Sequence, residues 1–173
     1  MDKNKFKKIL FKVAFCTMAC DGDIDDREIT EIKLMDKKAN YFADINLSNE
    51  LDQLINNFKA NGVGIIEGLF DEVAQTDFNS IQELLILEVA IRVIYADKIV
   101  DENEVKFFKF LRSKLKISNN IISDRFGDIS DVYDLKQNNE IEIRKTNHEF
   151  AETFKLPKMS EIIQIDLKNE NMV

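Results

Sequence analysis

Apolar residues recur at steps of three and four along most of the first 117 residues, which is the spacing of amphipathic helices. The pattern predicts six helices in this part of the chain, separated by short polar stretches. Their expected ranges are about 3–20, 25–39, 50–59, 65–73, 81–96 and 101–115. The fold class predicted from this pattern is all-α, with a helical bundle as the main body.

The segment from Ile81 to Ala96 is apolar around nearly its whole circumference. Its only charged residues are Glu83, Glu88 and Arg92, and the last two are four positions apart, where they can form an ion pair. A helix with such a narrow polar edge belongs inside a bundle rather than on its surface. We therefore expect this helix at the centre of the fold.

An acidic corner follows this central helix, and the same construction occurs earlier in the chain at a constant offset of 76 positions (97 − 21). The matched acids are Asp21 and Asp97, Asp25 and Asp101, and Glu28 and Glu104. Apolar residues match at the same offset, as Ile24 and Val100 do. The pattern indicates an internal two-fold repeat, in which each unit consists of a helix, an acidic corner and a second helix.

The helical signal weakens beyond residue 118. Short helices are expected at about 120–125 and 149–154. Two further stretches alternate apolar with polar residues, at Ile141 and Ile143 and at Ile163, Ile165 and Leu167. Alternation is a weak strand signal, so two short strands that could pair are expected there. The predicted organisation is a helical domain at 1–118 and a C-terminal extension at 119–173.

The composition supports this fold class and limits the function. Hydrophobic residues make up 45% of the 173 residues, and Pro157 is the single proline, which suits helices better than a sheet with many turns. The formal net charge of −8 argues against nonspecific binding to nucleic acid, because phosphate contacts need a basic surface. Such a charge suits cations or a basic protein partner.

No stretch of the chain is apolar for long enough to cross a membrane. The N-terminus is basic and then apolar, as in a signal peptide, but Lys12 interrupts the apolar part and the helical stripe continues past any cleavage point. We therefore expect a cytoplasmic protein. The lysines of the first helix are also compatible with peripheral membrane association, although a solvated face of a bundle helix is the favoured interpretation.

Two interpretations of the six matched acids remain open, and the first is binding of a divalent cation. Asp25 and Glu28 share one helix face, and Asp21 ends the preceding helix. Carboxylates about 4 Å apart repel by roughly 4 kcal/mol at an effective dielectric constant near 20, so such a cluster attracts positive charge. Because the six ligands are all carboxylates, the expected ion is calcium or magnesium.

In the second interpretation, the acids only cap helices. Asp25 and Asp101 fit as N-caps, and the glutamate three residues after each would close a capping box. This accounts for four of the six acids. It leaves Asp21 and Asp97 at helix C-termini, where negative charge is unfavourable.

No group of residues in the sequence points to catalysis. His148 is the only histidine, and Cys16 and Cys20 are one helical turn apart, where small buried residues are the expected role. Paired carboxylates could in principle hydrolyse a glycoside, but the chain has no tryptophan to line a sugar-binding cleft. We therefore expect no enzyme activity, and an acid-based hydrolase is the third alternative.

The two corners resemble the signature of TerB-like domains, the tellurite-resistance type. The matching segments are Cys20-Asp21-Gly22-x-Ile24-Asp25-x-x-Glu28-Ile29 and Ala96-Asp97-Lys98-x-Val100-Asp101-x-x-Glu104-Val105, and the resemblance covers about residues 3–117. There are two departures. Cys20 replaces the alanine of the motif, and Lys98 replaces its glycine at the second corner, where a positive charge would occupy or weaken the site.

The resemblance implies an all-helical domain that binds a divalent metal and works in stress-related or membrane-associated complexes. The metal ligands that it implies are Asp21, Asp25, Glu28, Asp97, Asp101 and Glu104. The function expected from the sequence is therefore a non-enzymatic, calcium- or magnesium-binding helical module that acts through protein partners. The alternative is a protein-interaction domain whose acids only cap helices.

Overall fold

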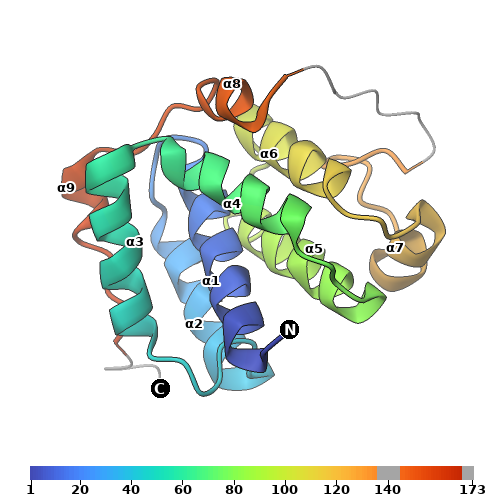
Figure 1. Ribbon diagram of the computed structural model, residues 1–173, viewed down its shortest axis with the longest axis horizontal. Coiled ribbons are helices and arrows are strands. Elements are labelled where there is room, and N and C mark those ends of the chain that lie inside the picture. Colours follow the sequence, from blue (N-terminus) through green and yellow to red (C-terminus); the bar gives the residue numbers. More distant parts are fainter. Residues whose placement is uncertain (136–144, 169–173) are drawn as a thin grey trace.

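The computed structural model describes residues 1–135 and 145–168, and all regular secondary structure in these residues is helical (Figure 1). The helices are α1 (Lys3–Ala19), α2 (Asp26–Ala39), α3 (Leu47–Asn61), α4 (Gly64–Gln75), α5 (Ser80–Ile94), α6 (Glu102–Ser113), α7 (Asn119–Phe126), α8 (Asn147–Ala151) and α9 (Met159–Ile162). The all-α helical bundle expected from the sequence is confirmed. None of the described helices is both long and apolar enough to cross a lipid bilayer.

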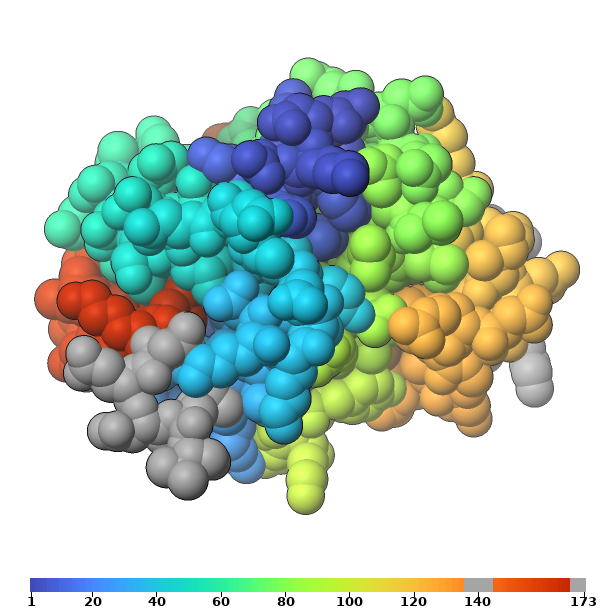
Figure 2. Space-filling view, turned by 90° about the horizontal axis from the view of Figure 1, so that it is seen from below, coloured from blue at the N-terminus to red at the C-terminus, as the bar shows by residue number. Residues whose placement is uncertain are grey.

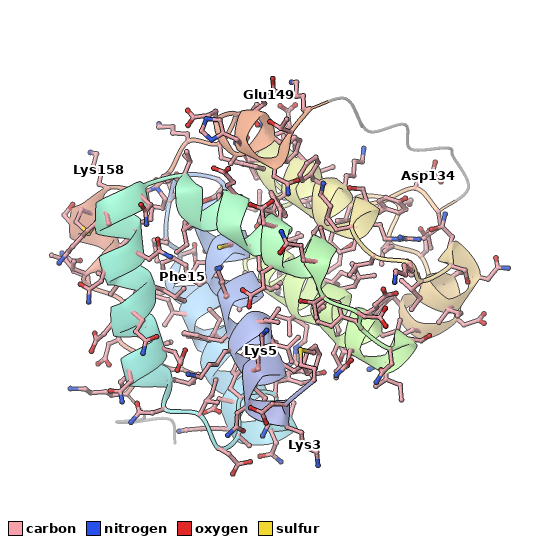
Figure 3. All side chains as sticks on the ribbon, in the orientation of Figure 1. Lys3, Lys5, Phe15, Asp134, Glu149 and Lys158 are labelled. Carbon is pink, nitrogen blue, oxygen red and sulfur yellow. The ribbon has the colours of Figure 1, made fainter. Side chains whose placement is uncertain are left out.

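α1 and α5 pack side by side at the centre of the bundle (Figure 1). Every residue of α1 from Val13 to Ala19 is buried, whereas its first turns carry exposed lysines. Figure 3 shows Lys3 and Lys5 at the outer end of this helix. α1 also contacts α3, α4 and α6. The central place expected for the helix at 81–96 is therefore shared by two helices, one from each repeat.

The two repeats pack against each other in a reciprocal way. The first repeat consists of α1 and α2, and the second consists of α5 and α6. α2 contacts α5, and α6 contacts α1, so the second helix of each repeat packs on the first helix of the other. This exchange brings the acidic corners close together, and Arg27 of the first corner donates a hydrogen bond to the backbone oxygen of Asp97 in the second.

The third helix begins about one turn earlier than the sequence pattern predicts. The side chain of Asn46 caps α3 by accepting a hydrogen bond from the backbone N–H of Asn49 at 3.1 Å. Leu47 is buried with Leu51 and Leu54, so the apolar stripe of the helix already includes the first residue after the cap. Asparagine and serine both cap helices well, so the sequence around residues 46–48 is compatible with more than one helix start.

The C-terminal extension packs onto the bundle and joins its hydrophobic core. α7 lies at one end of the molecule and α9 at the opposite end in both views (Figures 1 and 2). Between them, α8 contacts α4, and the Phe150 ring stacks on Phe110 with ring centres 3.7 Å apart. The Phe154 ring meets Phe107 edge-on. These rings attach the extension to α6 of the second repeat.

The strand expected at 163–167 does not form, and the described part of the chain contains no strand. α9 ends at Ile162, and Ile163 still has helical dihedral angles. Ile165 and Leu167 are buried in the main core cluster, whereas Ile163 is exposed. The alternation at Ile165 and Leu167 therefore reflects an irregular segment that lies on the bundle and buries these two side chains. The partner strand expected at 141–143 lies outside the described residues.

We expect Phe150→Ala to destabilise the whole protein by about 3 kcal/mol, because it leaves a cavity under a ring that is buried against the bundle. Urea unfolding followed by circular dichroism measures this change. The control is Ile163→Ala, whose side chain is exposed and should cost less than about 0.5 kcal/mol. Equal effects of the two variants would show that the extension is not part of the cooperative core.

Candidate functional site

The first acidic corner is a tight connection between α1 and α2. The carboxylate of Asp21 accepts a hydrogen bond from the N–H of Asp23 at 3.0 Å, and Gly22 then turns the chain with φ +93°. Asp25 caps α2 by accepting from the N–H of Arg27 at 2.7 Å. Glu28 accepts in return from the N–H of Asp25 at 3.0 Å, which completes a capping box.

The second corner repeats these bonds between α5 and α6. Asp97 accepts from the N–H of Ile99 at 2.8 Å. Asp101 caps α6, and Glu104 accepts from the N–H of Asp101 at 2.9 Å. Lys98 has φ +64°, the left-handed conformation of its counterpart glycine in the first corner. The repeat predicted from the sequence is thus confirmed at the level of single hydrogen bonds.

These bonds give all six acids a structural role. The expected capping boxes are present at both corners. Asp21 and Asp97, which capping left unexplained, each accept the N–H of the residue two positions on, an arrangement that stabilises a turn. Helix capping together with these turns is therefore sufficient to explain why acids occupy the six positions.

The burial of Glu28 and Glu104 is harder to explain by capping alone. Each is only 3% exposed, although a capping glutamate at a helix start can lie at the surface. Burial, with the nearby charges of Asp21 and Glu104 adding to it, raises the pKa of Glu28 to about 9. Burial likewise raises the pKa of Glu104 to about 8, with Asp21 and Asp97 adding to the effect. The acids of both corners therefore form one electrostatic cluster.

Arg27 is the cation that the structure places at this cluster, and the sequence interpretation did not include it. Its guanidinium donates to both carboxylate oxygens of Asp25, at 2.9 and 2.7 Å, and holds the pKa of that carboxyl down at about 2. It also reaches across to the backbone oxygen of Asp97 at 3.0 Å. The matched position in the second repeat is Asn103, so the repeat is not symmetric in charge.

Lys98 does not neutralise the acids of the second corner, although its positive charge suggested that it would. Its side chain is exposed, and no ion pair joins it to an acid of either corner within residues 1–135 and 145–168. The left-handed backbone at this position directs the chain through the turn, and the charge remains in solvent. The expectation that Lys98 would neutralise the second corner is therefore corrected, since Arg27 supplies the compensating charge from the first.

The donor set suits a hard cation, but its present arrangement does not form a ready site. Among the residues that the structure describes, no three acidic, cysteine or histidine side chains are placed to hold a metal ion. Glu28 and Glu104 each use Oε2 for the backbone N–H, and Asp21 and Asp97 each use Oδ1. Binding of an ion would therefore rely on the second oxygen of each group and on small side-chain rotations.

The other candidate residues take no part in this cluster as ligands. Cys16 and Cys20 are buried free thiols, and Cys20 donates to the backbone oxygen of Thr17, in agreement with the expected packing role. Burial raises the pKa of Cys16 to about 12, so this thiol keeps its proton at neutral pH. His148 is exposed on α8 and contacts Glu67 at 2.9 Å.

Protein-family models, curated proteins and solved structures were compared with the chain, and no match was found in any of the three. The resemblance to TerB-like domains therefore stays a prediction.

We expect stability to fall as pH rises, because the raised pKa values of Glu28 and Glu104 mean that the folded state keeps protons that the unfolded state releases. The contribution is complete below the unfolded pKa of about 4.5 and is lost progressively up to about 9. The melting temperature should fall by several degrees over this window, since about 1 kcal/mol corresponds to roughly 2–4 °C.

The double variant Glu28→Gln/Glu104→Gln tests the assignment. The structure contains a capping box with this side chain, because Gln82 accepts from the N–H of Asn79 at 3.0 Å. The amides should therefore keep the caps, remove the two charges and flatten the melting temperature profile. The exposed His148, whose pKa is raised by Glu67, titrates equally in both proteins. An unchanged slope in the double variant would show that other groups cause the pH dependence.

Proposed function

We propose that the two corners together form one centre for a hard divalent cation, calcium or magnesium, in a non-enzymatic helical module that acts through protein partners. The observation that supports it most directly is the burial of Glu28 and Glu104, from opposite repeats, beside Asp21 and Asp97. Buried carboxyl groups of like charge are stable only when a proton or a cation neutralises them. A divalent ion between the repeats would do so with a single particle.

The ligands would be carboxylate oxygens that the corner bonds leave over. Glu28 and Glu104 offer Oε1, and Asp21 and Asp97 offer Oδ2, so their backbone hydrogen bonds can persist. Asp101 uses Oδ1 for the N–H of Asn103 and can contribute in the same way. Asp25 is the weakest of the six candidates, because Arg27 engages both of its oxygens. A hard cation bound by the other five acids would neutralise the charge of the cluster.

The groups around these acids support a non-enzymatic role. The exposed histidine lies on α8 beside Glu67, and the thiols are buried with raised pKa values. A group that activates a nucleophile must lie within hydrogen-bond reach of it. The described corners contain carboxylates and Arg27, which suit ion binding and neutralisation. A stress-related, cytoplasmic role through protein partners, as the TerB-like resemblance implies, belongs to the same proposal.

The second candidate is an interaction domain whose corners are purely structural. Two observations favour it: every one of the six acids accepts a backbone N–H, and the described residues hold no preformed group of three metal ligands. In this case protons alone would neutralise Glu28 and Glu104. The two candidates differ in their response to added ions.

We expect millimolar calcium or magnesium to raise the melting temperature at pH 7, because a ligand of the folded state stabilises it by about 2.7 kcal/mol at a hundred times its dissociation constant. Since Glu28 and Glu104 hold protons at this pH, binding should also release protons. Calorimetry in buffers of different ionisation enthalpy measures that release. Glu28→Gln/Glu104→Gln should lose both responses. A melting curve that neither ion moves would favour the structural candidate.

Arg27→Asn should strengthen cation binding several-fold, because it removes a positive charge that reaches from the first corner to the second. Asparagine is the residue at the matched position of the second corner, Asn103. Lys98→Ala is the matched control, since it removes a charge of the same sign whose side chain is exposed. Calorimetric titration compares the affinities. A larger gain in Lys98→Ala would mean that Lys98, rather than Arg27, competes with the ion.

A further inference from the structure

A groove lies where α1, α3 and α4 pack against one another, and it takes no part in the acidic corners (Figure 1). Its volume is about 300 Å³, which is enough for a small organic ligand. The floor includes the buried side chains of Ile9 and Leu54, and the rim is polar. The corners begin only beyond the far end of α1, so the groove is a separate place on the molecule.

Three lysines of α1 line this groove. Lys5, Lys8 and Lys12 follow one another at steps of three and four, which places them on one face of the helix. Lys8 pairs with Glu50 of α3 at 2.7 Å, whereas Lys5 has no carboxylate partner in the part of the chain that the structure describes. With Glu72 of α4, three cations face two anions. The groove is therefore positive in a chain whose formal net charge is −8.

The ammonium of Lys12 is poorly satisfied within this groove. The side chain is only 18% exposed, so few water molecules reach it. Its acceptor among the described residues is Oε2 of Glu72 at 3.4 Å, whereas a hydrogen bond between an ammonium and a carboxylate is usually roughly 2.7–2.9 Å long. An ammonium has three donors. Lys12 therefore has room for a further oxygen acceptor.

Amide donors lie on the opposite wall, which α3 supplies through Gln53 and Asn57. Oδ1 of Asn57 accepts from Nδ2 of Asn61 at 2.7 Å, and this bond orients the Asn57 amide. Its own NH₂ group is left as a donor with no acceptor in residues 1–135 and 145–168. The carboxylate of Glu50 on the same wall is engaged by Lys8. The groups that remain available in the groove are therefore mainly donors, and they suit an oxyanion.

We propose that the groove between α1, α3 and α4 binds a small soluble molecule through a phosphate group. The ammonium of Lys12 and the NH₂ group of Asn57 donate to the phosphate oxygens, and Lys5 adds positive charge. A phosphate offers three terminal oxygens to these donors, and lysine binds it as a point charge. Glu72 is 32% exposed, so its carboxylate can turn into solvent when the phosphate lies beside Lys12. This site is independent of the cation centre proposed above.

Titration with inorganic phosphate and with glycerol 3-phosphate, in buffer free of divalent ions, tests the site. Nuclear magnetic resonance of the Gln53 and Asn57 side-chain amides should show saturable shifts at millimolar phosphate. The ester should bind more tightly, because its carbon atoms can lie on Ile9 and Leu54. Sodium chloride at equal ionic strength should leave these signals in place, and equal shifts in chloride would overturn the proposal.

A phospholipid headgroup is the other source of a phosphate group. Vesicles of phosphatidylcholine with phosphatidylserine should not sediment the protein, because a groove between three helices admits a free ester more easily than a headgroup held in a flat membrane. Sedimentation with these vesicles, combined with no response to either soluble phosphate, would overturn the proposal and assign the lysines to a membrane surface.

Lys12→Met should weaken binding of glycerol 3-phosphate about tenfold, which is the usual loss for one hydrogen bond to a charged group. The fold should persist, because the partly exposed Glu72 can be hydrated without its partner. Lys3→Met is the matched control, since it removes the same charge from the same helix outside the groove. The backbone amide signals of α3 report both affinities. Equal losses in the two variants would mean that net charge, rather than the groove, attracts the phosphate.

Asn57→Asp makes the complementary change on α3. The new carboxylate can still accept from Asn61, but it replaces the NH₂ donor with a negative oxygen. The saturable response to phosphate should be lost. Asn56→Asp adds the same charge at the neighbouring exposed position, which does not line the groove, and should bind phosphate with unchanged affinity. Undiminished binding in Asn57→Asp would contradict the proposed contact.

Discussion

Glu28 and Glu104 are buried where the two repeats meet, and this burial of like-charged groups constrains the rest of the structure. Each glutamate is fixed by the first turn of its own helix through a capping box. The packing of α2 on α5 and of α6 on α1 holds the starts of these two helices near each other. The protein must therefore neutralise the glutamates where they are, and protons, Arg27 and any bound cation compete for that task.

The sequence was a good guide where the determining contacts are local. The capping boxes at Asp25 and Asp101 were predicted because a cap and its glutamate lie only three residues apart. The turns at Asp21 and Asp97 are equally local and were missed, although an aspartate that accepts the N–H two residues on is a known turn pattern. At Asp21 and Asp97 the turn that follows the helix, rather than the helix end, determines what the carboxylate binds.

Contacts between distant parts of the chain were beyond the sequence argument. Arg27 reaches Asp97 over 70 positions, and no periodicity relates the two. Phe107 and Phe110 are buried because Phe150 and Phe154 of the C-terminal extension cover their faces. An amphipathic pattern shows that a face is apolar but not which distant segment covers it.

The reciprocal packing of the repeats has a consequence for the order of folding. The contact of Arg27 with Asp97 closes a loop of 70 positions, which costs more chain entropy than a local turn, so we expect the turns to form first. In that order, each corner forms first at the start of its own helix, with its glutamate still hydrated and charged, and the corner of the other repeat packs against it later. Joining of the two halves is the step that removes water from the glutamates. The corners therefore oppose the packing of the two repeats that burial of α1 against α5 favours, because carboxylates lose hydration when the halves join.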